Sequence, residues 1–273
     1  MSATRPAAVA GTFYPQAPEV LGAELRAYLQ HVAPALASAP RPKALIVPHA
    51  GYVYSGPIAA AAYARLTGLE GIRRVVLLGP AHRVPLHGLA VPSVDAFATP
   101  LGEIEVDRAA VTRALDLPQV SESDRAHALE HSLEVQLPFL QLLLGGFRVV
   151  PFAVGDATAA QVAEVIELLW GGPETLIVIS SDLSHYHAYG EARAIDQASA
   201  HTVLALSPTL GYEQACGARP INGLLTVARR RGLHPELLDL RNSGDTAGDK
   251  FRVVGYASFV FSEASGSFQV TTP

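Results

Sequence analysis

Lys43–Gly56, KALIVPHAGYVYSG, is a stretch in which a short apolar run ends at a proline and a histidine enters a glycine-bearing turn. Ala44–Val47 is expected to be a buried strand, because four consecutive apolar residues between such breakers are too few for a buried helix. Pro57–Leu66 is rich in alanine and begins with a proline, whose missing N–H is harmless at a first helical position, so a helix is expected there. The stretch therefore predicts a strand, a loop that carries His49, and a helix.

Two later apolar runs end in the same way. Arg73–Leu78, RRVVLL, is followed by GPAH, which ends at His82. Thr175–Ser180, TLIVIS, is followed by SDLSH, which contains Asp182 and ends at His185. Ligands of open α/β sheets bind beyond the carboxyl ends of the strands, so we expect these side chains to gather with the histidine of the first unit. Three polar loops, each directly after the carboxyl end of an expected strand, predict a functional site.

The rest of the chain alternates between helical and strand patterns. Ala128–Leu144 is expected to be one long helix with a kink at Pro138, because its leucines recur at helical spacing. Leu86–Val106 is expected to form short extended pieces, as a hairpin or a lid. The remaining expectations are helices at Pro18–Val32, Asp107–Leu115, Ala157–Trp170, Tyr189–Leu206 and Ile221–Arg231, strands at Phe147–Val154 and Val253–Phe261, and a loop at Asn242–Lys250.

This alternation predicts an α/β fold, a three-layer α-β-α sandwich with a mostly parallel or mixed central sheet. With 273 residues, 49 % of them apolar, and without an evident linker, residues 1–273 are expected to form a single domain. The net charge of −5 and the scattered arginines argue against a nucleic-acid partner. The absence of a long apolar run, of a leader-like start and of a second cysteine leads us to expect a cytoplasmic protein without a membrane partner.

The clustered loops suggest metal chemistry. Two neutral imidazoles and a third, anionic ligand commonly hold a redox-active or Lewis-acidic metal, and His49 and His82 are the candidate imidazoles. The third ligand is either Asp182 or Cys216 on this reasoning. His185 is the candidate general acid or base, because an imidazole titrates near neutrality, and Asp182 is placed to orient it.

Further residues are candidates for the substrate pocket. His131 is either a hydrogen-bonded histidine of a helix or a substrate contact, and its pairing with Glu134 three residues later is a weak metal motif. Tyr54 is expected at the pocket wall or rim. Arg219 either attracts a carboxylate-bearing substrate or forms a surface salt bridge. Cys216 has an alternative interpretation as a buried, inert thiol.

Several blocks of the sequence resemble one known family. AGTFYP, VPHAGYVYSG, GPAH, EHSLEVQLPFLQ, SSDLSHY, the ACG before Arg219 and the GDK before the last strand are similar to motifs of the Memo family, whose bacterial members are also called AmmeMemoRadiSam system protein B. The similar blocks run from about Ala10 to Phe261. The resemblance implies a fold shared with class III extradiol ring-cleaving dioxygenases, which are non-haem iron enzymes with two histidines and a carboxylate on the metal.

The resemblance also implies roles for individual residues. His49, His82 and Cys216 fall on the metal-binding triad of the Memo family, and Asp182 and His185 fall on its other pocket residues. A thiolate in place of a carboxylate is a softer ligand, which favours Cu(I) or Zn(II) more than a carboxylate does. The resemblance to the non-haem iron dioxygenases makes Fe(II) the expected cofactor. The thiolate makes Cu or Zn the alternatives.

Three functions follow as hypotheses. The first is a non-haem iron-dependent oxidoreductase, similar to a dioxygenase, that acts on a small-molecule substrate. The second is a non-catalytic binding or scaffold protein that uses the same crevice as a peptide or metabolite pocket, since eukaryotic members of the family are known for binding phosphotyrosine peptides. The third is a zinc-dependent hydrolase in which His185 activates a water. The family's compound name also implies a radical-SAM partner.

Overall fold

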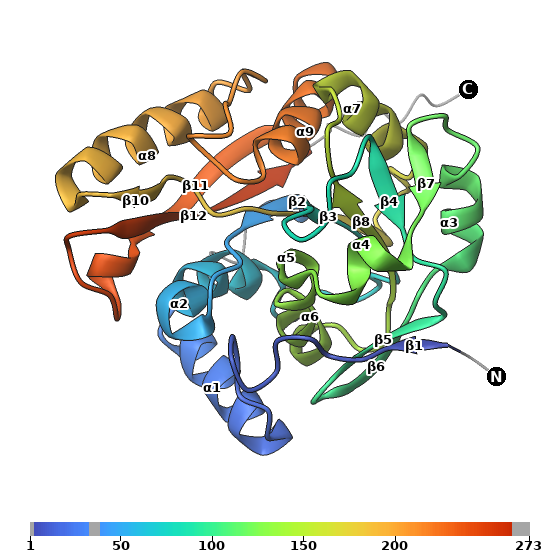
Figure 1. Ribbon diagram of the computed structural model, residues 1–273, viewed down its shortest axis with the longest axis horizontal. Helices are drawn as coiled ribbons and strands as arrows, with labels where there is room; N and C mark the ends of the chain where they lie inside the picture. The colour runs from blue at the N-terminus through green and yellow to red at the C-terminus, as the bar shows by residue number, and fades with distance from the viewer. Residues whose placement is uncertain (1–2, 33–38, 264–273) are drawn as a thin grey trace, which may run out of the picture.

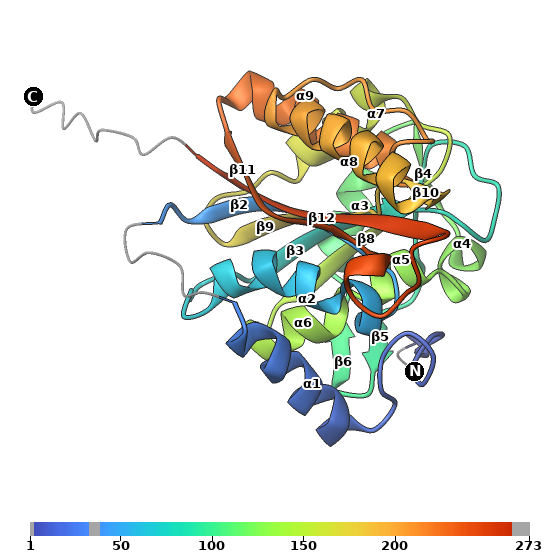
Figure 2. The same ribbon diagram turned by 90° about the vertical axis from the view of Figure 1, so that its left-hand side faces the viewer.

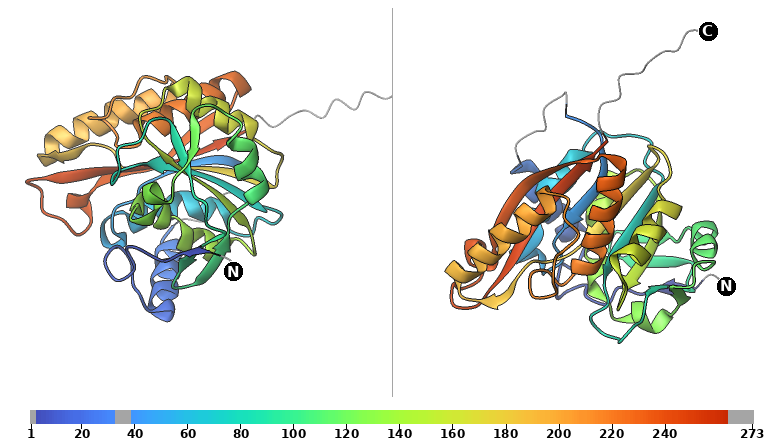
Figure 3. Two further views of the ribbon diagram at one scale, coloured as in Figure 1. Left: turned by 45° about the vertical axis from the view of Figure 1, so that its right-hand side comes forward. Right: turned by 90° about the horizontal axis from the view of Figure 1, so that it is seen from above.

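The computed structural model describes residues 3–32 and 39–263, and within these ranges nine strands form one mixed sheet. The strand order is β10-β12-β2-β9-β3-β8-β4-β7, with β11 paired to β12. Its strands are β2 (Pro42–Val47), β3 (Arg74–Pro80), β4 (Leu89–Val91), β7 (Val120–Glu122), β8 (Arg148–Val154), β9 (Thr175–Ser180), β10 (His185–His187), β11 (His234–Asn242) and β12 (Val253–Ser262). Figure 3 shows the sheet twisting between its helical layers.

A second, three-stranded sheet lies beside the first. It contains β1 (Thr4–Arg5), β5 (Ala96–Thr99) and β6 (Gly102–Glu105) in the order β1-β5-β6. β5 and β6 pair antiparallel, and β1 joins β5 in parallel, so the N-terminal strand is attached to the hairpin (Figure 1). The hairpin expected within Leu86–Val106 is therefore confirmed, and β4 from the same stretch belongs to the large sheet.

Helices cover both faces of the large sheet. On one face lie α7, α8 and α9, and on the other lie α1, α2 and α6 (Figure 2). This arrangement confirms the predicted α/β sandwich with a mixed central sheet. The helices are α1 (Pro18–Gln30), α2 (Tyr52–Tyr63), α3 (Arg108–Ala114), α4 (Asp124–Ala128), α5 (His131–Glu134), α6 (Leu137–Leu143), α7 (Ala159–Leu168), α8 (Tyr189–Leu204) and α9 (Ala218–Arg231), with 3-10 turns at Ala64–Leu66 and Ser243–Asp245.

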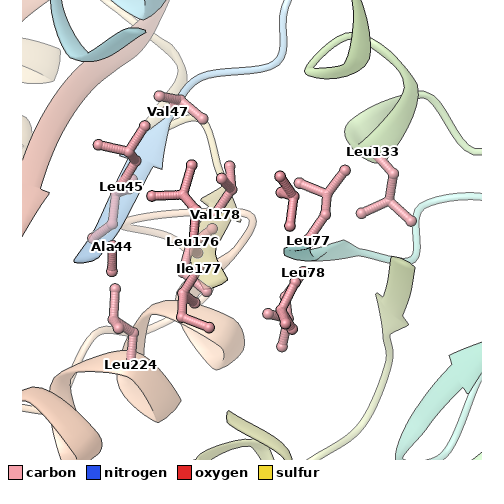
Figure 4. Packing of buried hydrophobic residues seen from close by; sticks show 14 of the residues in the cluster. Ala44, Leu45, Val47, Leu77, Leu78, Leu133, Leu176, Ile177, Val178 and Leu224 are labelled. Atoms are coloured by element: carbon pink, nitrogen blue, oxygen red, sulfur yellow. The ribbon is translucent and has the colours of Figure 1, made fainter. Parts of the chain in front are cut away.

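The middle of the sheet explains why its strands are so apolar. β2 and β9 are buried at every residue, because helices pack on both of their faces. Figure 4 shows Leu224 of α9 close to Ala44, and Leu133 of α5 near Leu77. All four side chains are less than 2 % exposed. None of the helices within the described ranges is long and apolar enough to cross a membrane.

Parallel pairing places three strand ends at one edge. β2 and β3 both pair in parallel with β9, with Val47 opposite Ser180 and Leu78 opposite Ile179. The chain therefore leaves all three strands at neighbouring points on the same side of the sheet. This geometry delivers the loops that carry the candidate site residues.

The helix after β2 starts earlier than predicted. α2 begins at Tyr52, so Pro57 lies inside the helix and not at its start. A proline there removes the N–H that would bond to the Val53 carbonyl, and Val53 is 57 % exposed. The loop between β2 and α2 is consequently only four residues long, which ties His49 closely to the sheet.

The long helix predicted at Ala128–Leu144 was wrong. The segment forms α4, α5 and α6, separated by breaks at Leu129–Glu130 and Val135–Gln136. Glu130 ends the continuity because its side chain caps α5 by accepting the N–H of Ser132 at 2.9 Å. Leu129, which the helical spacing assigned to an apolar face, is 66 % exposed. Pro138 lies in the first turn of α6, where proline is tolerated.

Candidate metal centre

Three imidazoles meet at the carboxyl edge of the sheet. His49 follows β2, His82 follows β3, and His131 begins α5, which packs against β3. One ring nitrogen from each lies within 4.8 Å of the others. The ring centroids are 5.2 Å apart for His49 and His82, 5.4 Å for His49 and His131, and 4.7 Å for His82 and His131. The predicted convergence of His49 and His82 is therefore present, and His131 joins them.

His49 is held by hydrogen bonds on both its backbone and its ring. Its N–H donates to Asp182 Oδ1 at 2.7 Å, and its Nδ1 lies 3.0 Å from Ser180 Oγ. The side chain is 2 % exposed. Burial lowers the pKa of His49 well below its usual value, and the neighbouring His82 and His131 lower it further. The ring is therefore neutral near pH 7.

The bonding of Ser180 identifies which nitrogen of His49 carries the proton. Ser180 Oγ donates its single proton to the Ser132 carbonyl at 2.6 Å and accepts from Gln136 Nε2 at 2.7 Å. Gln136 is itself oriented, because Tyr63 donates to its Oε1 at 2.9 Å. With its proton committed, Ser180 Oγ acts as an acceptor toward His49 Nδ1. The lone pair of His49 is then on Nε2, the nitrogen that could bind a metal and that lies 3.3 Å from Cys216 Sγ.

His82 is oriented by a buried carboxylate. Its Nδ1 lies 2.9 Å from Glu130 Oε1, and its backbone N–H donates to Oε2 at 2.6 Å. Burial by itself would raise the pKa of Glu130, but the hydrogen bond and charge of His82 and the N–H groups of Ser132 and His82 hold it at about 2. An ionised carboxylate accepts a hydrogen bond from Nδ1–H, so the lone pair of the neutral ring is on Nε2. This arrangement is typical of metal-bound histidines.

His131 is less constrained than the other two rings. Its Nδ1 lies 3.4 Å from Glu130 Oε1 and has no hydrogen-bond partner in the described part of the chain. Burial lowers its pKa, and the ring packs on Phe13 with centroids 4.8 Å apart. The His131–Glu134 pairing considered from the spacing does not form, because Glu134 binds the N-terminal segment and Glu130 faces the imidazoles.

Cys216 approaches the same cluster from the other side. Its Sγ lies 3.3 Å from His49 Nε2, just before α9 begins at Ala218. Burial and the charge of Asp182 raise the pKa of the thiol, and its side chain is 8 % exposed. A protonated thiol at this distance can donate a hydrogen bond to Nε2, and the ligand atoms that lie within 4.8 Å of one another are those of His49, His82 and His131, without Cys216.

Asp182 and His185 have separate partners. Asp182 is buried, and its Oδ1 accepts a hydrogen bond from the backbone N–H of His49. Its Oδ2 lies 4.0 Å from His49 Nε2. Burial raises the pKa of this carboxyl, against the opposing effects of His185 and of the His49 N–H. His185 Nδ1 lies 2.8 Å from the Leu183 carbonyl, so a backbone group and not Asp182 orients this imidazole.

The comparisons with known proteins identify the family. A family model described as Memo-like protein matches residues 5–260. The chain belongs to the Memo-like family. MEMO1 family proteins of Sulfolobus acidocaldarius and Archaeoglobus fulgidus are 37 % and 38 % identical to it, over 94 % and 93 % of this chain and 98 % and 97 % of theirs. An uncharacterized protein of Escherichia coli K12 has a similar fold, with a TM-score of 0.53, 13 % identity, and coverage of 80 % of this chain and 99 % of that one.

The site of this Memo-like protein opens into two adjoining hollows. One, of about 520 Å³, is lined by the three imidazoles, Cys216 and further residues: Arg83, Asp182, His185, Tyr186, Tyr212 and Glu213. The other, of about 610 Å³, shares His131 and His185 and extends over the aromatic rings of Phe13, Tyr54, Tyr186 and Tyr256. Tyr54 is among the residues that line the second hollow, and it is 38 % exposed.

Arg219 takes no part in either hollow of this Memo-like protein. Its Nη1 lies 2.7 Å from Asp156 Oδ1 and donates to the Ala157 carbonyl at 3.0 Å. The surface salt bridge, one of the two outcomes expected for Arg219, is the one observed. The charge that faces the first hollow comes instead from Arg83 and Glu213.

Sequence reasoning missed the two residues that orient the imidazoles in this Memo-like protein. Ser180 ends β9 and Glu130 precedes α5, and each contacts its histidine across 131 and 48 residues of chain. The one local signal is the polar run Glu130–Ser132, and the leucine spacing of the same segment predicts an unbroken helix across it.

Proposed function

We propose that this Memo-like protein is a metal-dependent oxidoreductase that holds Fe(II) between His49, His82 and a third ligand, and acts on a small molecule in the adjoining hollow. The observation that carries the proposal is the pairing of each imidazole Nδ1 with an acceptor, Ser180 for His49 and Glu130 for His82. Each ring then carries its lone pair on Nε2, and for His49 this nitrogen lies 3.3 Å from Cys216 Sγ. Such pairing is what metal-bound histidines require.

Two residues compete for the third position. His131 contributes a nitrogen to the cluster, and Cys216 Sγ lies 3.3 Å from His49 Nε2. A third imidazole suits Fe(II) and Zn(II), whereas a thiolate shifts the preference toward Cu(I) and Zn(II). The family resemblance favours Cys216, and the compactness of the imidazole cluster favours His131. An iron ion held there would supply a redox-active Lewis acid.

The surrounding residues have roles of their own in this proposal. The Leu183 carbonyl can only accept, so the bond to His185 Nδ1 leaves the lone pair of His185 on Nε2. His185 lines both hollows and is therefore the group that would take a proton from a bound substrate at Nε2. Asp182 would act by holding the loop of His49 through the backbone N–H.

Anaerobic reconstitution with Fe(II) tests this function. We expect stoichiometric iron and, after addition of nitric oxide to the ferrous protein, an electron paramagnetic resonance signal of a ferrous nitrosyl. The His49→Ala variant serves as the matched sample and should show neither. Zinc retained in preference to iron, together with amide hydrolysis that continues without oxygen, would instead favour the hydrolase.

The adjoining hollow favours a second candidate function, a binding pocket without turnover. Its wall contains four aromatic side chains, which suit a peptide or a metabolite more than a diatomic gas. Under this alternative, ligand binding measured by calorimetry should survive Cys216→Ala and removal of metal by a chelator. Binding that disappears with the metal favours the oxidoreductase.

A further inference from the structure

A buried arginine from the N-terminal strand contacts the segment that carries Glu130 and His131. Arg5 is 4 % exposed and lies in β1, more than 120 residues away in sequence. Its Nε donates to the His127 carbonyl at 2.7 Å, and its Nη2 donates to the Glu130 carbonyl at 2.7 Å. His127 lies in the last turn of α4, and Glu130 is the residue just before α5. Arg5 therefore brackets the turn from which Glu130 reaches His82.

The third contact of Arg5 is an ion pair with Glu134. Arg5 Nη1 lies 2.7 Å from Glu134 Oε2, and the Glu134 side chain is fully buried. The same carboxylate accepts from Ala8 N at 2.8 Å, Val9 N at 2.9 Å and Tyr14 Oη at 2.6 Å. The segment Ala3–Tyr14 is thus attached to α5 by one carboxylate. We call residues Ala3–Tyr14 the N-terminal strap.

Fold stability alone does not explain this arrangement. A buried ion pair is rarely more stabilising than apolar residues of the same volume, because both charges lose their hydration. What the pair provides is orientation: the planar guanidinium presents donors in fixed directions to two carbonyls and one carboxylate. Those contacts fix the backbone on both sides of Glu130, whose side chain binds His82 at two points and caps α5.

We propose that Arg5, acting through the N-terminal strap, is a positioning residue that holds Glu130 and His131 in place around the candidate metal centre. This inference rests on the proposed function, because the positioned residues serve metal binding only if the centre holds a metal. Arg5 lines neither hollow, so it acts through Glu130 and the α4–α5 turn. Arg5 positions these residues because its planar guanidinium donates in fixed directions. A lysine carries the same charge but lacks those directed donors, so it does not replace Arg5.

The test compares two Arg5 variants with a matched control. Arg5→Met removes the ion pair and both carbonyl contacts, and Arg5→Lys retains a cation for Glu134, which protects the fold. Lys43→Met is the control, because Lys43 is also a buried cation and donates to three carbonyls, those of Trp170, Gly172 and Thr175, at the opposite edge of the sheet. Two quantities are measured for each full-length protein: the Kd for Co(II), and the hydrogen exchange of the His82 and Ser132 amides in the metal-free state.

We expect both Arg5 variants to raise the Kd for Co(II) about 10- to 100-fold. Exchange of the His82 and Ser132 amides, which donate to Glu130, should accelerate at least about 10-fold, while β9 amides remain protected. Lys43→Met should change neither quantity, even at an equal loss of melting temperature. An unchanged Kd or unchanged amide exchange in the folded Arg5 variants overturns the proposal, and so does an equal effect of Lys43→Met. If the wild type binds no metal, the proposed function fails, and the exchange measurement alone supports or overturns the positioning role.

Discussion

His82 and Glu130 are joined by two hydrogen bonds, one from the ring and one from the backbone. Nδ1 lies 2.9 Å from Oε1, and the N–H donates to Oε2 at 2.6 Å. One carboxylate thus fixes both the ring orientation and the loop that carries it. Because Glu130 also caps α5, the same group connects His82 to His131. The candidate metal centre is therefore an arrangement of supported ligands and not of isolated loop histidines.

Glu130→Gln should weaken metal binding. The amide offers one acceptor oxygen in place of two and brings an NH₂ group toward donors, so the orientation of His82 is lost. We expect the Kd for Zn(II) or Co(II) to rise about 10- to 100-fold, measured by competition with a chromophoric chelator. Glu191→Gln is the matched control, because Glu191 lies 3.1 Å from His187 Nδ1 in a similar pair that contributes to neither hollow. Equal affinities in the two variants would contradict the role given to Glu130.

Ser180→Ala should destabilise the protein. It leaves the buried donors His49 Nδ1 and Gln136 Nε2 without their shared acceptor, at a loss of about 1–3 kcal/mol in the free energy of unfolding. Ser258 is equally buried, but its Oγ has no hydrogen-bond partner among the described residues. Ser258→Ala should therefore be neutral or stabilising, because it removes a buried hydroxyl whose desolvation no hydrogen bond offsets. Urea denaturation measures both, and equal losses would show that the Ser180 network adds nothing.

Gly217→Ala should disturb the position of Cys216. A Cβ at Gly217 would lie 2.6 Å from Ser181 Cβ and 2.9 Å from the Ser180 carbonyl oxygen, so the chain must shift. We expect a loss of about 1–3 kcal/mol in stability, typical of overpacking. A Cβ at Gly190, in the first turn of α8, would meet no atom within 4 Å, so Gly190→Ala should stabilise by about 0.4–1 kcal/mol. Thermal unfolding of both variants checks the opposite signs.

His127 should make the protein sensitive to acid. Burial lowers the pKa of His127 from 6.5 to about 4, and its Nε2 is bonded to the Ala90 carbonyl at 2.9 Å. The unfolded chain therefore takes up a proton between pH 6.5 and 4 that the folded chain does not, so stability falls as the pH falls through this window. The loss amounts to about 3 kcal/mol by pH 4.

A variant that cannot titrate isolates this effect from the carboxyl groups. His127→Gln retains a side-chain donor for the Ala90 carbonyl, and its free energy of unfolding should decline less steeply from pH 6.5 to 4. Urea denaturation at a series of pH values measures the difference between the two curves. Parallel curves would mean that His127 is protonated in the folded state, contrary to its burial.

The elements predicted most successfully are those decided by local apolar runs. β2, β3 and β9 are continuous apolar segments, and their parallel pairing brought His49 and His82 together as expected. α9 ends at Gly232, whose φ of 66° is the left-handed conformation typical of a helix end. Where the signal lies within a few residues, the sequence was sufficient.

The remaining errors have tertiary causes. At the helix break, Glu130 bonds to His82, 48 residues earlier, as well as capping α5, and the leucine spacing gives no sign of that distant contact. β11 was missed because it contains a proline and several charged residues, and its pairing with β12 does not require an apolar pattern. Ser180 reads as the last residue of a strand, and its role appears only when His49 and Gln136 meet it.

Equilibrium dialysis of the untagged protein with Fe(II) under anaerobic conditions tests the metal centre most directly. We expect stoichiometric binding by the wild type and by His201→Ala, since His201 is an exposed residue of α8 that lines neither hollow, and loss of binding in folded His49→Ala and His82→Ala. The same measurement on His131→Ala and Cys216→Ala identifies the third ligand. Undiminished binding by folded His49→Ala and His82→Ala, or no binding by the wild type, would contradict the central claim.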